Sequence, residues 1–183
     1  MYSLKCASRK ESLSMIIAVD VYYEENKAKS VGVIFYSWED SNPLEIITSY
    51  TENPQEYETG FFYKRELPCI QELLKFTDIN RIHTIVVDGY VYLNNEKKPG
   101  LGHYVYTHFS GTIPVIGVAK SAFHDNETFV KKVYRGNSSK PLYISSVGME
   151  LEVAAEHIQS MYGEYRFPYL LRLLDKQTKE ARL

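Results

Sequence analysis

The sequence predicts an α/β fold in which a mixed central sheet is flanked by helices. The first observation is the run Ile-Val-Val at 85–87, which continues directly into Asp88. A second apolar run, at 15–19, leads in the same way into Asp20. Uninterrupted β-branched runs are typical of strands that are buried on both faces. The third observation is that apolar residues recur at helical spacing within 67–74, which predicts an amphipathic helix against the sheet.

The composition bounds the class of protein. With 183 residues, 44% of them hydrophobic and 24% charged, the chain is long enough for one domain with a full core. No apolar run has transmembrane length and no signal-peptide segment is recognisable, so we expect no membrane association. The two cysteines do not make a disulfide framework, which favours a cytoplasmic location. A net charge of −2 means that any binding of nucleic acid must come from a local basic patch.

The first part of the chain predicts an antiparallel meander. Residues 1–14 show no clear period and are expected to form a loosely ordered N-terminal extension, with a single domain at 15–183. Short polar connections separate three strand-like runs, and such connections favour antiparallel pairing. The runs lie at 15–24, 29–37 and 45–51, and a loop follows at 52–60.

The first helix is expected to begin near Leu67, because Pro68 is tolerated in a first helical turn. Glu66 then lies just before the helix, where the positive end of the helix dipole stabilises a carboxylate.

The second part of the chain alternates strands with helices. The remaining elements are a polar loop at 94–102, a helical segment at 104–109, a strand at 113–119 that ends at Lys120, a hairpin from 128–134 and 142–147, and helices at 150–162 and from Pro168. Three antiparallel strands, a helix, and then strands alternating with helices are the topology of ribonuclease H-like folds. This is an inference about fold, and fold alone does not fix function.

The two strand aspartates are the first candidate site residues. Ligands bind at the carboxyl ends of strands in open α/β sheets, which is where Asp88 is expected. Asp20 lies between Val19 and Val21, and an ionised carboxylate inside a buried strand is costly unless it is paired. A shared cation would explain both residues. The alternative is that one aspartate faces water and the other caps a turn.

Several stretches, taken together and in order, resemble the endonuclease V family. They span about residues 15–180 and are Val19-Asp-Val-Tyr-Tyr23, Gly60-Phe-Phe-Tyr-Lys-Arg-Glu66, Val87-Asp-Gly-Tyr90, Gly100-Leu-Gly-His103, Pro114-Val-Ile-Gly-Val-Ala-Lys120, Lys140-Pro-Leu-Tyr-Ile144 and Tyr165-Arg-Phe-Pro168. The resemblance implies a ribonuclease H-like fold. It also implies an enzyme that uses Mg²⁺ or Mn²⁺ to nick DNA or RNA on the 3′ side of a deaminated base, notably hypoxanthine in inosine.

The resemblance also implies roles for individual residues. The acidic triad of the family falls on Asp20, Glu66 and Asp88, and its lysine falls on Lys120. Three carboxylates suit Mg²⁺, which prefers octahedral oxygen ligands and keeps several waters. Lys120 beside the scissile phosphate would stabilise charge in the transition state. Its alternative is a solvated lysine that simply follows a strand.

Four further residues are expected to contact substrate. Tyr57 is the remnant of the wedge that fills the gap left by a flipped base. Gly89 and Gly117 allow close approach to the strand backbone. Lys140 belongs to a basic set with Lys131, Lys132 and Arg135, which either binds the phosphate backbone or forms a solvated hairpin.

Three segments depart from the family pattern. The wedge motif Pro-Tyr-x-Pro is replaced by Glu56-Tyr-Glu-Thr59, which loses both prolines and adds two glutamates. The family histidine before the penultimate helix aligns with Met149, so we expect a cationic group to be missing from the site. The His-Pro-Arg stretch after the Asp88 strand has become Asn94-Asn-Glu-Lys-Lys-Pro99. The departures leave two alternatives open: a binding relative that cuts poorly or not at all, and a nuclease with another target.

Overall fold

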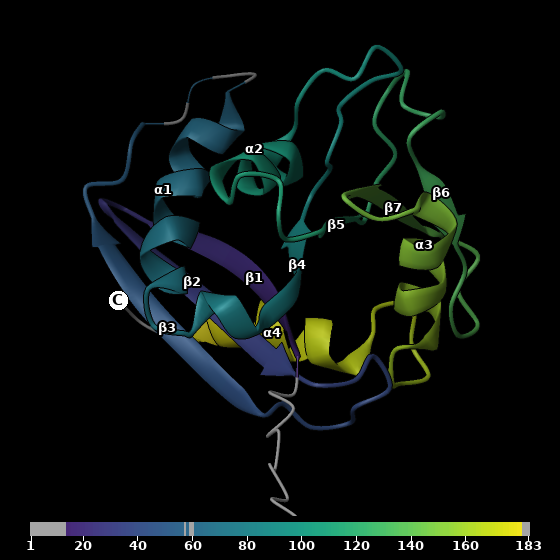
Figure 1. The fold of residues 1–183 in the computed structure, drawn as a ribbon, viewed down its shortest axis with the longest axis horizontal. Coiled ribbons are helices and arrows are strands. Elements are labelled where there is room, and N and C mark those ends of the chain that lie inside the picture. The colour runs from purple at the N-terminus through teal and green to yellow at the C-terminus, as the bar shows by residue number, and fades with distance from the viewer. Residues whose placement is uncertain (1–13, 57, 59–60, 181–183) are drawn as a thin grey trace, which may run out of the picture.

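The computed structural model describes residues 14–56, 58 and 61–180, and these form one seven-stranded sheet with helices on both faces (Figure 1). The expected extension at 1–14 lies outside the described residues apart from Ser14. The strand order is β3-β2-β1-β4-β5-β7-β6. The strands are β1 (Met15–Glu24), β2 (Lys27–Phe35), β3 (Glu45–Glu52), β4 (Ile82–Asp88), β5 (Val115–Ala119), β6 (Lys131–Val133) and β7 (Leu142–Val147).

The sheet is mixed, as the sequence predicts. β1, β2 and β3 form the antiparallel meander, and β4 and β5 run parallel to β1. β7 and β6 form the hairpin, and β7 is antiparallel to β5. The carboxyl ends of the three central parallel strands therefore lie at one edge of the sheet, together with the beginning of β7.

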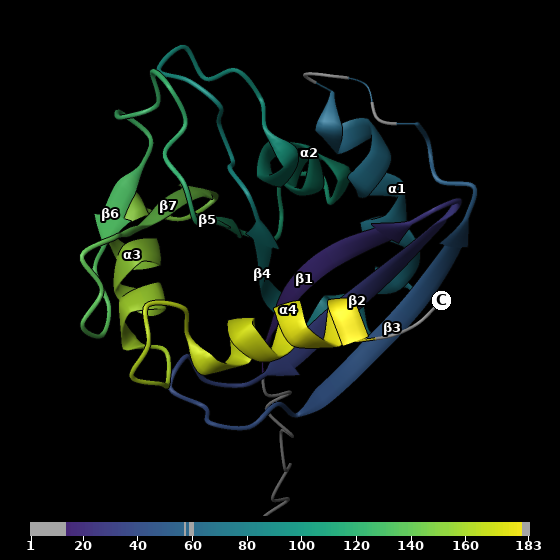
Figure 2. The ribbon, with the colours of Figure 1, turned by 180° about the vertical axis from the view of Figure 1, so that it is seen from behind.

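The helices divide between the two faces (Figures 1 and 2). Helices α1 (Phe62–Leu74) and α2 (Leu101–His108) share one buried cluster with the sheet. Helices α3 (Leu151–Ser160) and α4 (Tyr169–Glu180) share the other. A short 3₁₀ helix, η1 (Ile79–Arg81), precedes β4. The alternation along β1 makes the division clear, because Ile16 and Ala18 pack on the α4 face whereas Ile17 and Val19 pack on the α1 face.

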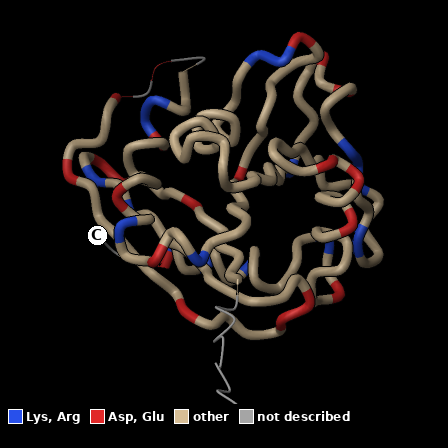
Figure 3. Tube along the Cα trace, in the orientation of Figure 1, with Lys and Arg blue, Asp and Glu red and all other residues tan. Residues whose placement is uncertain are grey.

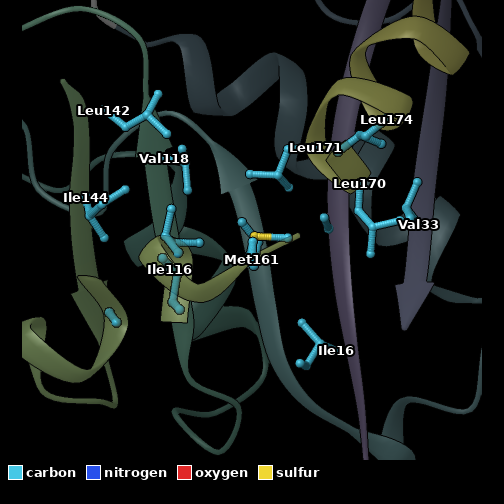
Figure 4. Close-up of a cluster of buried hydrophobic side chains, with 14 of the residues drawn as sticks. Ile16, Val33, Ile116, Val118, Leu142, Ile144, Met161, Leu170, Leu171 and Leu174 are labelled. Atoms are coloured by element: carbon cyan, nitrogen blue, oxygen red, sulfur yellow. The ribbon is translucent and has the colours of Figure 1, made fainter. Parts of the chain in front are cut away.

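The core under α3 and α4 is closely packed with aliphatic side chains. Figure 4 shows Ile16 and Val33 from the meander near Leu170 and Leu171 of α4, with Met161 between them and Ile116 of β5. Each of these side chains is at most 3% exposed. Burying one such side chain contributes about 1.5–3 kcal/mol, so the seam that holds α4 on the sheet is strong. This packing fixes how α4 is rotated on the sheet, and therefore where its polar side chains lie.

Two predictions about helix positions are wrong. Helix α1 begins at Phe62, five residues before Leu67, and contains Pro68 in its interior. The helix tolerates this proline because the residues that follow it are packed on the sheet. These buried residues are Cys69, Ile70, Leu73 and Leu74. Glu66 therefore lies inside α1 and not ahead of it. Helix α2 likewise begins at Leu101, inside the segment expected to be a loop.

The expectation about Met149 is also wrong. β7 is antiparallel to β5, and Val147 at its end pairs with Val115 at the start of β5. Met149 thus lies at the sheet edge opposite Asp88, where it packs against the core under α3 and α4. The methionine removes no group from the carboxyl-end edge of the sheet.

Charged residues of both signs are spread along the part of the chain that the structure describes. Figure 3 shows lysines and arginines intermixed with aspartates and glutamates along the trace. Among the described helices, none has the length and apolar character needed to cross a bilayer.

Candidate metal-binding active site

Asp20 and Asp88 lie side by side at the carboxyl edge of the central strands. Val19 of β1 is paired with Val87 of β4, and the two aspartates are the next residue on each strand. Neighbouring strands are about 4.8 Å apart. Since side chains alternate along a strand, both aspartates point to the face that α4 covers. The convergence that the sequence predicted for these two carboxylates is thus present in the fold.

The Asp20 carboxylate is held by two donors. One oxygen accepts a hydrogen bond from the Thr178 hydroxyl at 2.7 Å, and the other accepts one from the backbone N–H of Val21 at 2.9 Å. Burial raises the pKa of Asp20, and the hydrogen bonds from Thr178 and Val21 offset part of the rise. Thr178 is fully buried on α4, so it orients Asp20 from a fixed position.

Glu66 reaches the same edge from the opposite face of the sheet. It is 7% exposed on the inner side of α1. Burial raises the pKa of Glu66 well above its usual value, and the negative charges of Asp20 and Asp88 raise it further. The helix dipole therefore does not govern this carboxyl, contrary to the sequence-based expectation. Within the described ranges the Glu66 side chain has no hydrogen bond or ion pair, although the neighbouring Arg65 lowers its pKa somewhat.

Lys120 is paired with carboxylates and is not simply solvated. Its Nζ lies 3.0 Å from Asp175 Oδ1 and 3.7 Å from Asp88 Oδ2. It also lies 4.7 Å from the centre of the Phe167 ring. Burial acts to lower the pKa of Lys120, but Asp88 and Asp175 outweigh it and the pKa is raised.

Asp175 is a fourth acidic residue of the site that the sequence reasoning missed. It lies on α4 one turn before Thr178, and it lines a narrow cleft together with Asp20 and Asp88. Burial would raise the pKa of Asp175, but the ammonium groups of Lys179 and Lys120 lower it on balance. The available signal was the helical register of α4, because Asp175 and Thr178 continue the stripe of Leu171 and Leu174.

The cleft is large enough for one metal ion or one water molecule. It encloses about 20 Å³, whereas one water needs about 10–15 Å³. Apolar side chains make up most of its lining, and the charged residues on it are Asp20, Asp88, Lys120 and Asp175. Among the described residues, no three acidic, histidine or cysteine side chains already form a cage for an ion. The acidic residues at this edge of the sheet still fit a hard divalent cation, because Asp20, Asp88 and Asp175 offer carboxylate oxygens and the buried Glu66 of α1 adds another.

An apolar pocket opens beside Asp88 on the α1 side of the sheet. It has a volume of about 470 Å³ and is bounded by the start of α1, the turn after β4 and the start of α2. Phe62, Tyr63 and Phe123 supply aromatic walls. Gly100 is required in the floor, because an added Cβ would lie 2.5 Å from the carbonyl oxygen of Tyr90. The pocket has the size and the apolar lining of a small-molecule site.

The four remaining predicted site residues differ in where they lie. Gly89 has φ +131° and no atom within 4 Å of its Cβ direction, so the backbone beside Asp88 stays open. Gly117 is packed against the chain itself, because a Cβ would lie 2.5 Å from the Gly89 carbonyl oxygen and 2.6 Å from Ser145 Oγ. Lys140 is exposed in the loop before β7, and Tyr57 lies outside the described residues.

The chain is similar in sequence to a known protein family over nearly its whole length. A model of the family described as Endonuclease V matches residues 3–176, nearly the whole chain. The chain belongs to the endonuclease V family. It is accordingly an endonuclease, and its mixed sheet is a ribonuclease H-like fold.

Individual relatives agree with this assignment. The endonuclease V of Bacillus thuringiensis subsp. konkukian is 26% identical over 199 residues, which cover 94% of this chain and 83% of the relative. Among solved structures, the endonuclease V of Ciona intestinalis in complex with a 23mer DNA containing an inosine has a TM-score of 0.77 at 18% identity, covering 91% of this chain and 84% of that one. Human endonuclease V has a TM-score of 0.72 at 21% identity, covering 93% and 84%.

Proposed function

We propose that this endonuclease V family member uses Mg²⁺ or Mn²⁺ to nick a DNA or RNA strand on the 3′ side of a deaminated base. The observation that supports the proposal is the pair Asp20 and Asp88 at the neighbouring ends of β1 and β4, with Glu66 of α1 close enough for their charges to raise its pKa. The inosine-containing DNA bound to the Ciona relative supports the class of substrate.

Asp20, Glu66 and Asp88 would hold the cation, and Asp175 is close enough to the cleft to assist. Burial raises the pKa of Asp88, and Asp20 and Asp175 raise it further against the opposing effect of Lys120. Crowded carboxylates of this kind repel one another until a positive charge joins them. When bound, the divalent ion supplies Lewis acidity, which activates water and stabilises charge on the leaving oxygen.

Lys120 can pair either with carboxylates of the cleft or with a bound phosphate. Without substrate its ammonium group pairs with Asp175 and Asp88 across the cleft. A phosphodiester at the cleft brings a new negative charge, and Lys120 then stabilises the developing charge on the phosphate oxygens. The Phe167 ring under Lys120 keeps the ammonium group at the cleft in either case.

The apolar pocket beside Asp88 takes the base. A base turned out of the stack is read in a shaped pocket with aromatic walls, and here Phe62, Tyr63 and Phe123 provide them. The pocket and the carboxylates share Asp88, so the nucleotide that fills the pocket brings its phosphate to the cleft. Tyr57 remains our candidate for the wedge that fills the vacated stack.

The test is a cleavage assay on paired DNA and RNA oligonucleotides that contain a single inosine. We expect Mn²⁺- or Mg²⁺-dependent nicking of the inosine strands and much slower nicking of the matched adenosine strands. Asp88→Asn should abolish cleavage, whereas Asp78→Asn, on the N-cap of η1, should not affect it. Equal cutting by wild type and Asp88→Asn would refute the proposal.

One observation favours the alternative of a relative that binds but cuts poorly. The wedge segment carries Glu56 and Glu58, which repel phosphates, and lacks the stiffness that two prolines provide. The same assay separates the two functions, since metal-dependent binding of inosine strands without product would favour the binding relative.

A further inference from the structure

We propose that a second hollow beside the base pocket binds the adjacent nucleotide of the same strand, with Phe123 standing between the two bases. The inference rests on the proposed function and adds a second nucleotide subsite to it. The second hollow has a volume of about 590 Å³ and is formed by the segment after β5 together with β6 and β7. Phe123 lines both this hollow and the pocket beside Asp88. The two spaces are therefore neighbours that share one aromatic side chain.

Phe123 is held in place while much of its ring stays accessible. The side chain is 49% exposed, and the edge of Tyr90 supports it at a ring separation of 6.0 Å. Tyr90 is itself buried, and its hydroxyl donates a hydrogen bond of 2.6 Å to the carbonyl of Ser121. This bond ties the base of the segment that carries Phe123 to the β4 turn. A fixed and half-exposed ring is suited to stacking on bases, because every base presents a π-face.

The hollow also carries a positive charge for a phosphate. Lys132 of β6 is paired with Tyr143 of β7, and residues directly opposite each other share one face of the sheet. The preceding Lys131 is tied to Glu152 by an ion pair of 2.8 Å. Lys132 has no such pair among the described residues. Glu127 lies on the wall as well and disfavours an anion, so the phosphate is expected on the Lys132 side.

A polar group on the wall lacks a partner. Asn126 is 6% exposed, and its Nδ2 donates a hydrogen bond of 2.5 Å to the Tyr92 carbonyl. Its Oδ1 is buried and has no hydrogen-bond partner within the described residues. This oxygen is shielded from the hollow, so Asn126 contributes to the wall as a fixed, buried side chain. The wall is rigid, because Asn95 Oδ1 accepts from the backbone N–H groups of Glu127 and Thr128 at 2.9 and 2.8 Å.

The experiment is a double-mutant cycle between the protein and the strand. Single-stranded oligonucleotides carry one inosine, and the nucleotide on its 5′ or its 3′ side is either normal or abasic. Binding is measured by fluorescence anisotropy and cleavage under single-turnover conditions with Mn²⁺. An abasic neighbour on one of the two sides should weaken wild-type binding about tenfold, the usual scale of one stacked base. Phe123→Leu should weaken binding of the intact strand by a similar factor and should be insensitive to the abasic neighbour.

Three further variants sharpen the result. Phe123→Tyr keeps an aromatic ring and should restore the sensitivity to the abasic neighbour. Lys132→Gln should weaken binding severalfold and make it less dependent on salt. Tyr134→Leu and Lys75→Gln are the matched controls, because neither residue lines either hollow and Lys75 caps the far end of α1. Neither control should change binding.

The outcomes separate this inference from the proposed function. If the wild type cuts inosine strands but is insensitive to abasic neighbours on both sides, the second subsite is refuted and the proposed function stands. Independent, multiplicative effects of Phe123→Leu and the abasic neighbour would also refute it. A wild-type chain that neither cuts nor binds inosine strands would overturn both.

Discussion

Replacing Thr178 by valine should weaken the cation site without touching a carboxylate. Thr178 donates a 2.7 Å hydrogen bond to Asp20 and is fully buried on α4. Valine has nearly the same shape and fills the same space, so the core of Leu170, Leu171 and Leu174 keeps its packing. The change removes one hydrogen bond to an ionised acceptor, which is worth about 1.5–3 kcal/mol. The Asp20 oxygen can recover part of this from water, because Asp20 is only half-buried.

The expected effects follow from those magnitudes. The free energy of unfolding should fall by about 1–2 kcal/mol, which corresponds to roughly 2–8 °C in Tm for a chain of this size. A residue that orients a metal ligand typically contributes 10–100-fold to metal affinity, so the Mn²⁺ concentration for half-maximal cleavage should rise about tenfold or more. The maximal rate at saturating Mn²⁺ should fall much less, since all four carboxylates and Lys120 remain.

The assay is cleavage of an inosine oligonucleotide over a Mn²⁺ titration, with Tm measured in parallel. Thr178→Ser keeps the hydroxyl and should restore the wild-type metal requirement. Thr107→Val is the matched control, because the Thr107 hydroxyl bonds only a carbonyl of its own helix and lies on an exposed face. A folded Thr178→Val protein with an unchanged Mn²⁺ requirement would show that Asp20 does not depend on this bond, and the account of the site would need another orienting group.

Three other changes give distinct readouts. Because the folded state raises the pKa of Glu66, the folded state binds more protons than the unfolded one, and stability without metal should fall as pH rises from about 4.5 through the raised pKa. Glu66→Gln should therefore be more stable than wild type at pH 8 without metal, while it is inactive; an unchanged or lower Tm there would contradict this reading. Gly117→Ala should lower the free energy of unfolding by about 1–3 kcal/mol, because the new Cβ collides with the Gly89 carbonyl oxygen. A denaturant titration measures this, and a Gly117→Ala protein as stable as wild type would rule out that close approach. Burial lowers the pKa of His157, whose ring stacks on that of Trp38 with the ring centres 4.6 Å apart. The fluorescence of Trp38, the single tryptophan of the chain, should therefore change with pH at a midpoint below 6.5. A midpoint above 6.5 would mean that the attraction between the charged imidazole and the indole ring outweighs burial.

The sequence predicted the parts of the site that local patterns encode. Asp20 and Asp88 stand out because each interrupts or ends an apolar strand, and the strand period then decides which face they share. The resemblance to a family added Glu66, but Pro68 misled the assignment of its helix. A proline inside a helix looks like a helix start when only neighbouring residues are considered, and the packing of α1 on the sheet overrides that signal.

The parts that failed depend on long-range topology. Asp175 reads as one more polar residue of an amphipathic helix, and only the docking of α4 over β1 turns it toward the cleft. Met149 looked like a lost site residue because its neighbours in sequence resemble a family motif. The antiparallel direction of β7 places it at the other edge of the sheet, and no local pattern contains that direction.

The charge balance of the cleft explains why a cation is part of the proposal. Asp20, Glu66, Asp88 and Asp175 bring four carboxylates to one edge of the sheet, and Lys120 is the ammonium group that pairs with two of them. Burial and mutual repulsion raise the pKa of Asp20, Glu66 and Asp88, so each ionised carboxylate there costs stability. Amides or leucines at the same positions would cost the fold less. This cost supports the proposed divalent cation, which would neutralise the carboxylates, and the proposed role of Lys120, which would exchange a carboxylate partner for the phosphate.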